Sequence, residues 1–384
     1  MMRKIILSAT FLLFCFVNFT VAAEDVFVRV AILRETKGFA LSIRGKFDVM
    51  DAEKGKLLGT QKGLRDVMVV PDGDAIKIGE ESYRVSDLKI IPHQRATVTL
   101  NNKQYRGTIE IIRSKDGKAF LVVNAVELER YVKGVLYHEM PYYWPMEALK
   151  SQAVVARTYA VYRTQISQKE LYDVTSDIYS QVYGGRSAER YRSNIAVNRT
   201  RGEVIFYKDK IIPAFFHATC GGATEDAAEL WNVNLPPLRG VECPFCVMSP
   251  HYRWKKNFRS QSVQETLNQR GYKLGLIKEI KVTERDRSGR IRKLQIITRD
   301  KKTVEISGKD FREIIGPNVL KSNFYDIEMK GYYFDIIGRG WGHGAGMCQW
   351  GVYGMAQQRY RYEQILQYYY PSSEIIKYKK NLSK

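Results

Sequence analysis

Residues 122–163 read VVNAVELERYVKGVLYHEMPYYWPMEALKSQAVVARTYAVYR, and they mark the place where the pattern of the chain changes. Apolar residues recur at helical spacing over residues 127–140 and again over 146–168, and the Pro-rich bend PYYWP (141–145) separates the two runs. The stretch therefore predicts two consecutive helices joined by a sharp bend.

A single carboxylate, Glu139, lies at the end of the first helical run. It shares a face with Leu128 and Val132, because helix positions three or four residues apart lie on one side. Pro141 ends the helix and leaves the carboxylate at the rim of the surface on which this face packs. Desolvation there raises the pKa of a carboxyl, which suits a general acid near neutral pH. The structural alternative is an ion pair, with Arg157 on the second helix as a candidate partner.

Strand-like runs fill the chain ahead of these helices. Alternating apolar and polar residues, split by Gly, Asp and Pro, occupy residues 26–113, and a hairpin turn leads into AFLVVN (119–124). After the helices, the sequence contains an amphipathic stretch at 262–271. It then predicts strands at 276–283, 291–298 and 303–307, and a final helix that a Gly-rich segment (338–356) opens and that runs to about Tyr370.

The first 23 residues have the three parts of a secretory signal. Arg3 and Lys4 give a positive start, residues 5–19 form an apolar run, and residues 20–23 give a small-residue exit suited to cleavage after Ala23. A membrane anchor is the alternative, but the apolar run is short for a full span. We therefore expect an exported protein of the cell envelope, in the periplasm or the extracytoplasmic wall space.

Composition and pattern together predict a globular α+β protein. The chain has 384 residues, of which 45% are hydrophobic and 27% charged. After the signal peptide (1–23), we expect a β-rich N-terminal subdomain (24–104) merged with an α+β catalytic domain (105–371), and then a basic tail (372–384). We expect the protein to be mostly monomeric.

The net charge of +20 bears on the partners. A strongly basic protein favours nucleic acid, anionic envelope polymers or membrane surfaces. Export argues against nucleic acid, and Lys and Arg are spread along the whole chain. We therefore expect contact with polyanionic cell-wall material and no nucleic-acid partner.

The stretch at 122–163 closely resembles the stage II sporulation protein D (SpoIID)/LytB family. Its pattern is N-x-V-x-L-E-x-Y-x-x-G-V-x-x-x-E-M-P, followed by a helix of the type A-L-K-A-Q-A-x-A-A-R-T-Y. Three further blocks match in family order: TSDIYSQVYGG (175–185), FHATCGGATEDAAELW (216–231) and RGWGHGAGMCQWGVYGMA (339–356). Four blocks in order are a specific signal, and they imply that the α+β catalytic domain is of the SpoIID type.

The resemblance implies cell-wall lysis. Catalytic members of the family are lytic transglycosylases, which cut the bond between N-acetylmuramic acid (MurNAc) and N-acetylglucosamine (GlcNAc) in peptidoglycan and leave a 1,6-anhydro end. The catalytic Glu of the family carries over to Glu139. One carboxylate suffices, because the nucleophile is the substrate's own C6 hydroxyl and not a second side chain or an activated water.

Two other functions stay open. Some members of the family are amidase enhancers, which implies a non-catalytic module that grips glycan and stimulates a partner cell-wall amidase. A zinc hydrolase that uses His217 and the cysteines is the other alternative.

Residues in the other blocks are candidates for binding the glycan. The dense glycines at 338–356 let the backbone approach a ligand closely, and aromatic and polar side chains between them suit a sugar cleft. The candidate substrate-binding residues are Tyr179, Gln181, Tyr183, Trp341, His343, Met347 and Gln349.

His217, Cys220, Cys243 and Cys246 form the pattern H-x2-C and C-x2-C. This spacing offers one imidazole and three thiolates to a tetrahedral zinc ion. A disulfide from Cys220 to Cys243 or to Cys246 is the alternative in an exported protein. In either case the expected role is structural, because a site with four protein ligands has no open position for catalysis.

Overall fold

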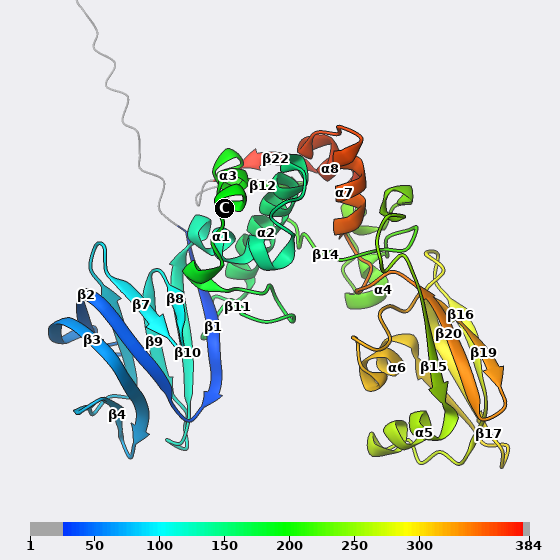
Figure 1. Cartoon of the computed structure of the whole chain (residues 1–384), viewed down its shortest axis with the longest axis horizontal. Coiled ribbons are helices and arrows are strands. Elements are labelled where there is room, and N and C mark those ends of the chain that lie inside the picture. The colour runs from blue at the N-terminus through cyan, green and yellow to red at the C-terminus, as the bar shows by residue number, and fades with distance from the viewer. Residues whose placement is uncertain (1–25, 379–384) are drawn as a thin grey trace, which may run out of the picture.

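The structure is a computed structural model that describes residues 26–378. It confirms the mixed α+β fold, with two lobes on either side of a helical centre (Figure 1). The predicted signal peptide lies outside the described residues. None of the helices within 26–378 is both long and apolar enough to cross a membrane.

The N-terminal lobe is a large sheet. Its strands are β1 (Phe27–Thr36), β2 (Phe39–Asp51), β3 (Lys56–Asp72), β4 (Ala75–Ile78), β5 (Glu81–Tyr83), β6 (Asp87–Pro92), β7 (Thr97–Leu100), β8 (Lys103–Tyr105), β9 (Thr108–Arg113), β10 (Phe120–Glu127) and β11 (Val174–Thr175). The order is β11-β1-β10-β9-β6-β2-β3-β4-β5, with β7 paired to β2 and β8 paired to β7. Alternate residues of the strands, such as Phe39, Leu41 and Ile43 on β2, are buried inside the lobe. The sheet continues past residue 104, through β9 and β10, directly into the first helix.

The centre contains most of the helices and the short strands that join them. They are α1 (Leu128–Glu139), α2 (Met146–Ile166), α3 (Tyr191–Arg199), α4 (Ala227–Trp231), α7 (Gln349–Gln357), α8 (Tyr362–Tyr369), the short 3-10 helices η1 (Gly185–Ala188), η2 (Pro236–Leu238) and η3 (Pro244–Cys246), and the strands β12 (Glu203–Tyr207), β13 (Lys210–Ile211), β14 (Phe216–His217), β21 (Met347–Cys348) and β22 (Glu374–Lys377). The two predicted helices are confirmed as α1 and α2. Small buried side chains on α2, such as Ala153, Ala156 and Ala160, let its neighbours pack closely.

The C-terminal part of the centre differs from the sequence prediction. The prediction of a single final helix is wrong. The chain forms two helices, α7 and α8, and Arg359 between them has a φ of 66°. A non-glycine residue with positive φ does not continue a right-handed helix. Residues 374–377, part of the predicted tail, form β22, which pairs antiparallel with β12.

The C-terminal lobe has its own hydrophobic core. Its elements are β15 (Arg253–Arg259), α5 (Ser260–Gln269), β16 (Ile277–Arg285), β17 (Ile291–Thr298), β18 (Thr303–Ser307), α6 (Gly308–Ile315), β19 (Tyr325–Lys330) and β20 (Tyr333–Arg339). The three predicted strands of this region are confirmed as β16, β17 and β18, and the amphipathic stretch at 262–271 lies largely in α5. Leu267, Leu294 and Phe311 are fully buried in this second core, separate from the core of the rest of the chain.

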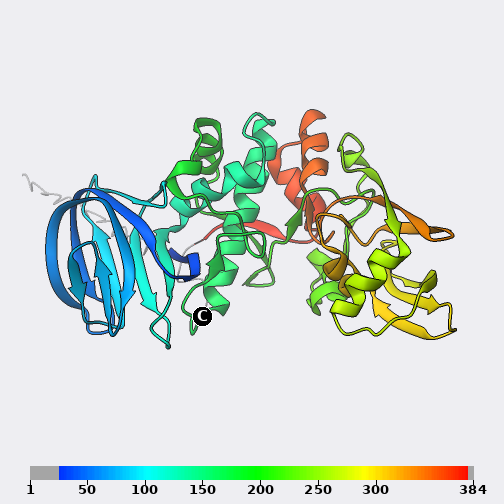
Figure 2. The ribbon, with the colours of Figure 1, turned by 60° about the horizontal axis from the view of Figure 1, so that its bottom comes forward.

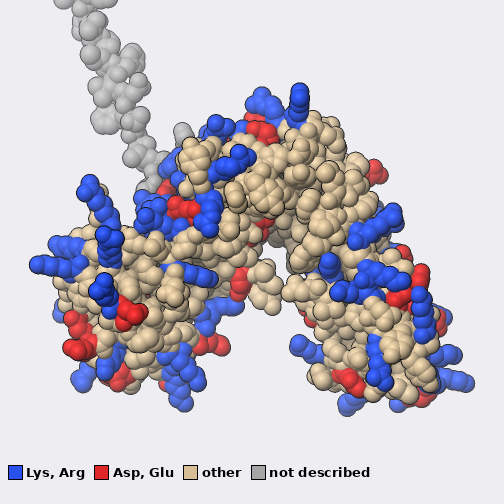
Figure 3. Space-filling model, viewed as in Figure 1, with Lys and Arg blue, Asp and Glu red and all other residues tan. Residues whose placement is uncertain are grey.

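The C-terminal lobe is an insertion into the centre. The chain leaves the centre after η3, builds the lobe, and returns at β21 (Figure 2). β14 pairs in parallel with β21, so residues from before and after the insertion lie side by side. In the space-filling view the two lobes stand apart below the centre, with an open gap between them (Figure 3).

Candidate active site

Glu139 lies in the wall of a cavity of about 750 Å³ in the centre of the molecule. The side chain is half-buried at the end of α1, as expected from the apolar face and the Met-Pro stop. Glu139 is the one carboxylate among the cavity-lining residues of the described chain. The cavity therefore offers one acidic group to whatever it binds.

Burial raises the pKa of Glu139 from its usual value to about 7, although the hydrogen bond from the backbone N–H of Val182 to Oε1 (2.8 Å) opposes the shift. Within residues 26–378, Glu139 makes no ion pair. Arg157, the partner considered from the sequence, instead forms two bonds of 2.8 Å with the carboxylate of Glu129. A half-buried carboxyl with no cationic partner keeps its proton near neutral pH.

The backbone carbonyl of Glu139 is hydrogen-bonded to the first residue of α7. Gln349, the first residue of that helix, donates from Nε2 to the carbonyl oxygen of Glu139 (2.8 Å) and to Oε1 of Gln152 (3.2 Å). Segments that are 210 residues apart along the chain are thus joined at the carboxyl-bearing end of α1.

The loop that carries Val182 packs closely on α1 because both contact surfaces contain glycine. A Cβ at Gly134 would lie 2.5 Å from the ring of Tyr183, and one at Gly184 would lie 2.4 Å from Nε2 of His138. The N–H of Gly184 donates to the carbonyl of Gly134 (3.0 Å). This close approach holds the N–H of Val182 against the carboxylate of Glu139.

Aromatic side chains form the opposite wall. The ring centroids of Phe215 and Trp231 lie 4.4 Å apart, and those of Trp231 and His343 lie 5.0 Å apart. Burial lowers the pKa of His343 to about 4, so its ring is neutral at pH 7. Its Nδ1 accepts from the N–H of Ala345 (3.1 Å), which leaves the proton on Nε2.

His217 also lines the cavity, at the end of β14. Its Nδ1 lies 3.1 Å from the carbonyl oxygen of Ala345 and donates to it, so Nε2 carries the lone pair. Burial lowers the pKa of His217 well below its usual value. Nε2 is buried and has no hydrogen-bond partner within the described residues.

The predicted substrate-binding residues divide into two groups. Tyr179, Trp341, His343 and Gln349 line the cavity with Glu139. Gln181, Tyr183 and Met347 do not line it and are buried. Tyr183 stacks on Tyr131 with ring centroids 5.3 Å apart, and Gln181 accepts a hydrogen bond from the hydroxyl of Tyr131 (3.0 Å). These buried residues support the wall from behind.

One side of the cavity is formed by residues that are not among the predicted site residues. Tyr159, Tyr162, Arg163 and Ile166 of α2 line it. They are three or four residues apart and therefore share one face of the helix, which is the signal that could have identified them. Trp231, at the end of the third family block, was also missed as a lining residue.

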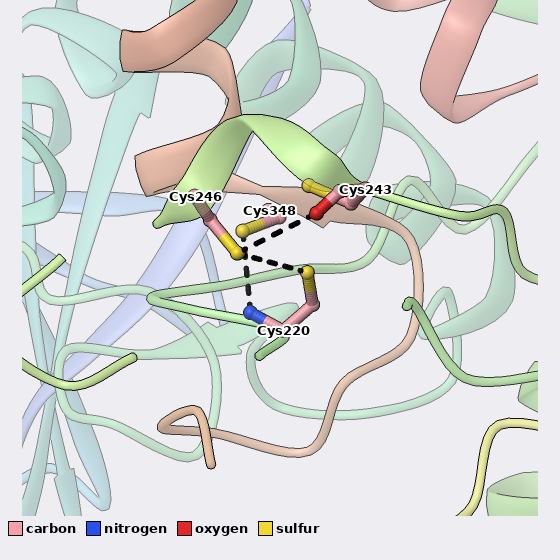
Figure 4. A group of neighbouring side chains, drawn as sticks. All are labelled: Cys220, Cys243, Cys246 and Cys348. Atoms are coloured by element: carbon pink, nitrogen blue, oxygen red, sulfur yellow. Dashed lines mark hydrogen bonds between the residues drawn. The ribbon is translucent and has the colours of Figure 1, made fainter. Parts of the chain in front are cut away.

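The structure brings four cysteines together. The Sγ atoms of Cys220, Cys243, Cys246 and Cys348 all lie within 4.8 Å of one another, and all four side chains are buried (Figure 4). His217 is not a member of this group; Cys348 takes the place expected for it. The sequence signal for Cys348 was the even count of four cysteines after the signal peptide.

The four thiols fit a tetrahedral metal ion. With zinc–sulfur bonds of about 2.3 Å, the sulfurs of a tetrahedral site lie about 3.8 Å apart. The Sγ atoms of Cys220 and Cys246 are 3.5 Å apart, and the whole group stays within 4.8 Å. Backbone N–H groups of Cys220 (3.2 Å) and Gly351 (3.3 Å) donate to Sγ of Cys348, which stabilises a thiolate. The cluster is compatible with a structural metal such as zinc.

The fold and the cavity define an α+β protein that holds one carboxyl of raised pKa in an aromatic-lined cleft. Residues 116–207 match the family SpoIID, described as Stage II sporulation protein, and residues 247–346 match a domain of unknown function (DUF8618). The chain is 31% identical to Stage II sporulation protein D of Bacillus amyloliquefaciens, over 68% of this chain and 78% of that protein. The chain belongs to the SpoIID family.

Two further relatives extend the comparison. An uncharacterized protein of Brachyspira hyodysenteriae is 33% identical over 93% of this chain and 94% of its own length. The Amidase enhancer of Bacillus subtilis is 28% identical over 80% of this chain, but the match spans only 47% of that longer protein.

Proposed function

We propose that this protein is an exported peptidoglycan lytic transglycosylase that cleaves the MurNAc–GlcNAc bond and leaves 1,6-anhydro-MurNAc ends. The observation that carries the proposal is Glu139, a carboxyl with a pKa of about 7 and the one acidic group in the cavity lining of the described chain. Glycosidases that hydrolyse their substrate use a pair of carboxyl groups. A single carboxyl fits a reaction in which the substrate supplies the nucleophile.

In this mechanism Glu139 acts first as an acid and then as a base. Its protonated carboxyl gives the proton to the glycosidic oxygen while the bond from that oxygen to C1 of MurNAc breaks. The carboxylate then takes the proton of the C6 hydroxyl, and the C6 oxygen forms the new bond to C1. No water is consumed, and Glu139 ends the cycle protonated. The intramolecular hydroxyl acts at a high effective concentration.

The cavity walls supply the binding surface. Trp341 and Tyr179 offer aromatic faces to sugar rings, and the neutral ring of His343 and the amide of Gln349 offer polar contacts to hydroxyl and acetamido groups. The hydrogen bond from Val182 to Glu139 holds the carboxyl in place without removing its proton. We assign glycan binding to these residues of the lining.

We further propose that Cys220, Cys243, Cys246 and Cys348 hold a structural zinc ion. All four are buried, and a four-thiolate site leaves no position for a substrate. When bound, the metal supplies cross-linking between three segments of the centre.

The second candidate function is a glycan-binding enhancer of a cell-wall amidase. The similarity to a protein named Amidase enhancer favours it, although the match spans less than half of that protein. In this case the cavity would bind glycan without cleaving it.

The test is Glu139→Gln, assayed for anhydro-muropeptides released from purified peptidoglycan. We expect the rate to fall by about 10²–10⁴-fold, the usual contribution of a general acid or base. Glu265→Gln is the control, because this carboxyl is exposed on α5 and lies outside the cavity lining. The control should keep its activity, since the same change is made at a carboxyl that does not face the cavity.

Full activity of Glu139→Gln would overturn the transglycosylase proposal. A wild-type protein that yields no anhydro ends but stimulates an amidase would favour the enhancer. Loss of activity on chelation, with reducing ends as the products, would favour the zinc hydrolase.

A further inference from the structure

The bend between α1 and α2 exposes two aromatic side chains. Tyr142 and Tyr143 are 44% and 70% exposed, and their ring centroids lie 5.7 Å apart. Neither ring lines the cavity that contains Glu139. Large apolar groups that lie side by side on a surface indicate a place where something binds.

The backbone that carries these two rings is held firmly. The N–H of Trp144 donates to the carbonyl of Pro141 (3.0 Å), which closes the turn, and the buried ring of Trp144 lies 5.0 Å from that of Trp350. Arg192 of α3 donates to the carbonyl oxygens of Tyr142 and Trp144 (3.0 Å each). A fixed backbone loses little freedom on binding, so the exposed rings are preorganised for a ligand.

The exposed rings are continuous with the candidate active site. The ring centroid of Tyr142 lies 6.2 Å from that of Tyr137, and the ring of Tyr137 lies 5.2 Å from that of His138. His138 lines the cavity that contains Glu139. We call Tyr137, His138, Tyr142 and Tyr143 the aromatic row. Because His138 belongs both to the row and to the cavity lining, the row leads out of the cavity.

Cations lie beside the aromatic row. The guanidinium group of Arg190 lies over the ring of Tyr137, 4.2 Å from its centroid. Burial, and after it the charges of Lys103 and Arg190, lower the pKa of His138, so its ring is neutral at pH 7. In the part of the chain that the structure describes, the side chains of Arg190 and Arg192 donate only to backbone carbonyls. Their charges are therefore not neutralised by a carboxylate of the protein.

We propose that the aromatic row is a distal subsite for the glycan strand, and that it binds sugar rings beyond those held in the cavity. The inference rests on the proposed function, because the strand that continues onto the row must lie in the cavity. Aromatic rings bury the apolar faces of sugar rings. Each MurNAc of a peptide-free strand also carries a lactyl carboxylate, a group that the guanidinium groups of Arg190 and Arg192 match. The row therefore favours long strands over short fragments.

The experiment measures the affinity for peptide-free glycan strands in a Glu139→Gln background, so that no cleavage takes place. The strands are separated by length into a long fraction and a tetrasaccharide fraction. The test variant replaces Tyr142 and Tyr143 with Ala. The control variant replaces Tyr332 and Tyr333 with Ala, which removes two exposed rings from the hairpin of β19 and β20 on the C-terminal lobe. All four side chains are exposed, so both variants should fold, and their melting curves verify this.

We expect the test variant to bind the long strands about tenfold more weakly, since each stacked ring contributes a factor of about three. It should bind the tetrasaccharide as the parent does, because the cavity lining is unchanged. The control variant should bind both fractions as the parent does. Replacement of Tyr142 and Tyr143 with Phe should retain the affinity for long strands, since the ring faces remain.

Equal affinity of the test variant and the parent for long strands would overturn the proposal. If that variant also failed to stimulate a cell-wall amidase, the row would be a surface for a protein partner instead. An equal loss of affinity for long strands and tetrasaccharide would overturn the proposal as well, because the rings would then act on the cavity itself. Absence of anhydro ends from the wild type would contradict the role of Glu139 but not the row, whose test measures binding alone.

Discussion

Burial of the ionised form of the Glu139 carboxyl costs free energy, whereas an exposed carboxylate elsewhere on the chain costs little. Most Asp and Glu side chains of this basic protein are exposed or paired with a cation, whereas Glu139 is half-buried and receives a hydrogen bond only from the backbone at Val182. An ion pair such as that of Glu129 with Arg157 would stabilise the ionised form and remove the acid. The absence of such a partner around Glu139, within the described residues, is what keeps it a proton donor.

The pH dependence of cleavage tests this directly. Burial favours the neutral form, so the folded protein keeps the proton of Glu139 up to a pH of about 7. We expect kcat/KM to fall about tenfold per pH unit above this value and to be flat or limited by other groups below it. The measurement is a pH–rate profile of anhydro-muropeptide release between pH 5 and about 9. A rate that keeps rising to the alkaline end would contradict an acid of this pKa.

For single residues, the sequence predicted where a side chain lies better than which residues it contacts. The helical spacing up to Glu139 and the following Pro141 placed the carboxyl correctly at a buried rim. The partner of Arg157 and the buried state of Tyr183 depend on residues far away in the chain, and local periodicity holds no information on them. A Tyr or Gln in a family block can bind substrate or support the wall behind it, and only packing decides which.

Among the elements, α1 and the loop at 176–188 act as a unit. Gly134 lets the ring of Tyr183 approach the helix, and Tyr183 is fixed at its other end by a hydrogen bond to Asn124 (2.8 Å) on β10. The loop thereby holds the N–H of Val182 at 2.8 Å from Oε1 of Glu139. The helical period of the sequence predicts α1. It does not predict the contact that Gly134 allows, because the partner of a helical glycine is set by tertiary packing.

Gly134→Ala should uncouple the loop from the helix. The added Cβ would lie 2.5 Å from the ring of Tyr183, so the ring and the loop must move. Overpacking costs about 1–3 kcal/mol, and the better helix propensity of Ala returns about 1 kcal/mol, so the protein should stay folded. We expect cleavage to fall by about tenfold or more, because a small displacement of an active-site group is costly.

The control for this variant is Gly59→Ala on β3, where the new Cβ would meet no atom within 4 Å. Its activity and melting temperature should match the wild type. Unchanged activity of Gly134→Ala would show that the loop does not position Glu139.

At the scale of the whole molecule, the four cysteines lie where the C-terminal lobe joins the centre. Cys246 ends η3, just before the lobe, and Cys348 follows directly after it. Cys220 follows β14 by three residues. His217 of β14 and the next residue, Ala218, line the cavity. A metal at this cluster would fasten both connections of the lobe and one wall of the cavity. The sequence predicted a metal-type spacing but chose His217 as the fourth ligand, because Cys348 is about 100 residues from the others and separated from them by a complete folded lobe.

The zinc assignment can be tested against a disulfide by counting thiols and metal in the same sample. We expect about one zinc per chain and four free thiols after denaturation in chelator without reductant, since all four cysteines are free in the structure. Cys348→Ser should lose the metal and lower the melting temperature by roughly 5–10 °C, because each kcal/mol lost shifts the melting temperature by a few degrees in a protein of this size. Met355→Leu, a change of similar volume on α7, should retain both the metal and the melting temperature. A count of two free thiols and no zinc would contradict the zinc assignment and indicate a disulfide. The connection of the lobe to the centre would then depend on the redox state of the compartment and not on the supply of metal.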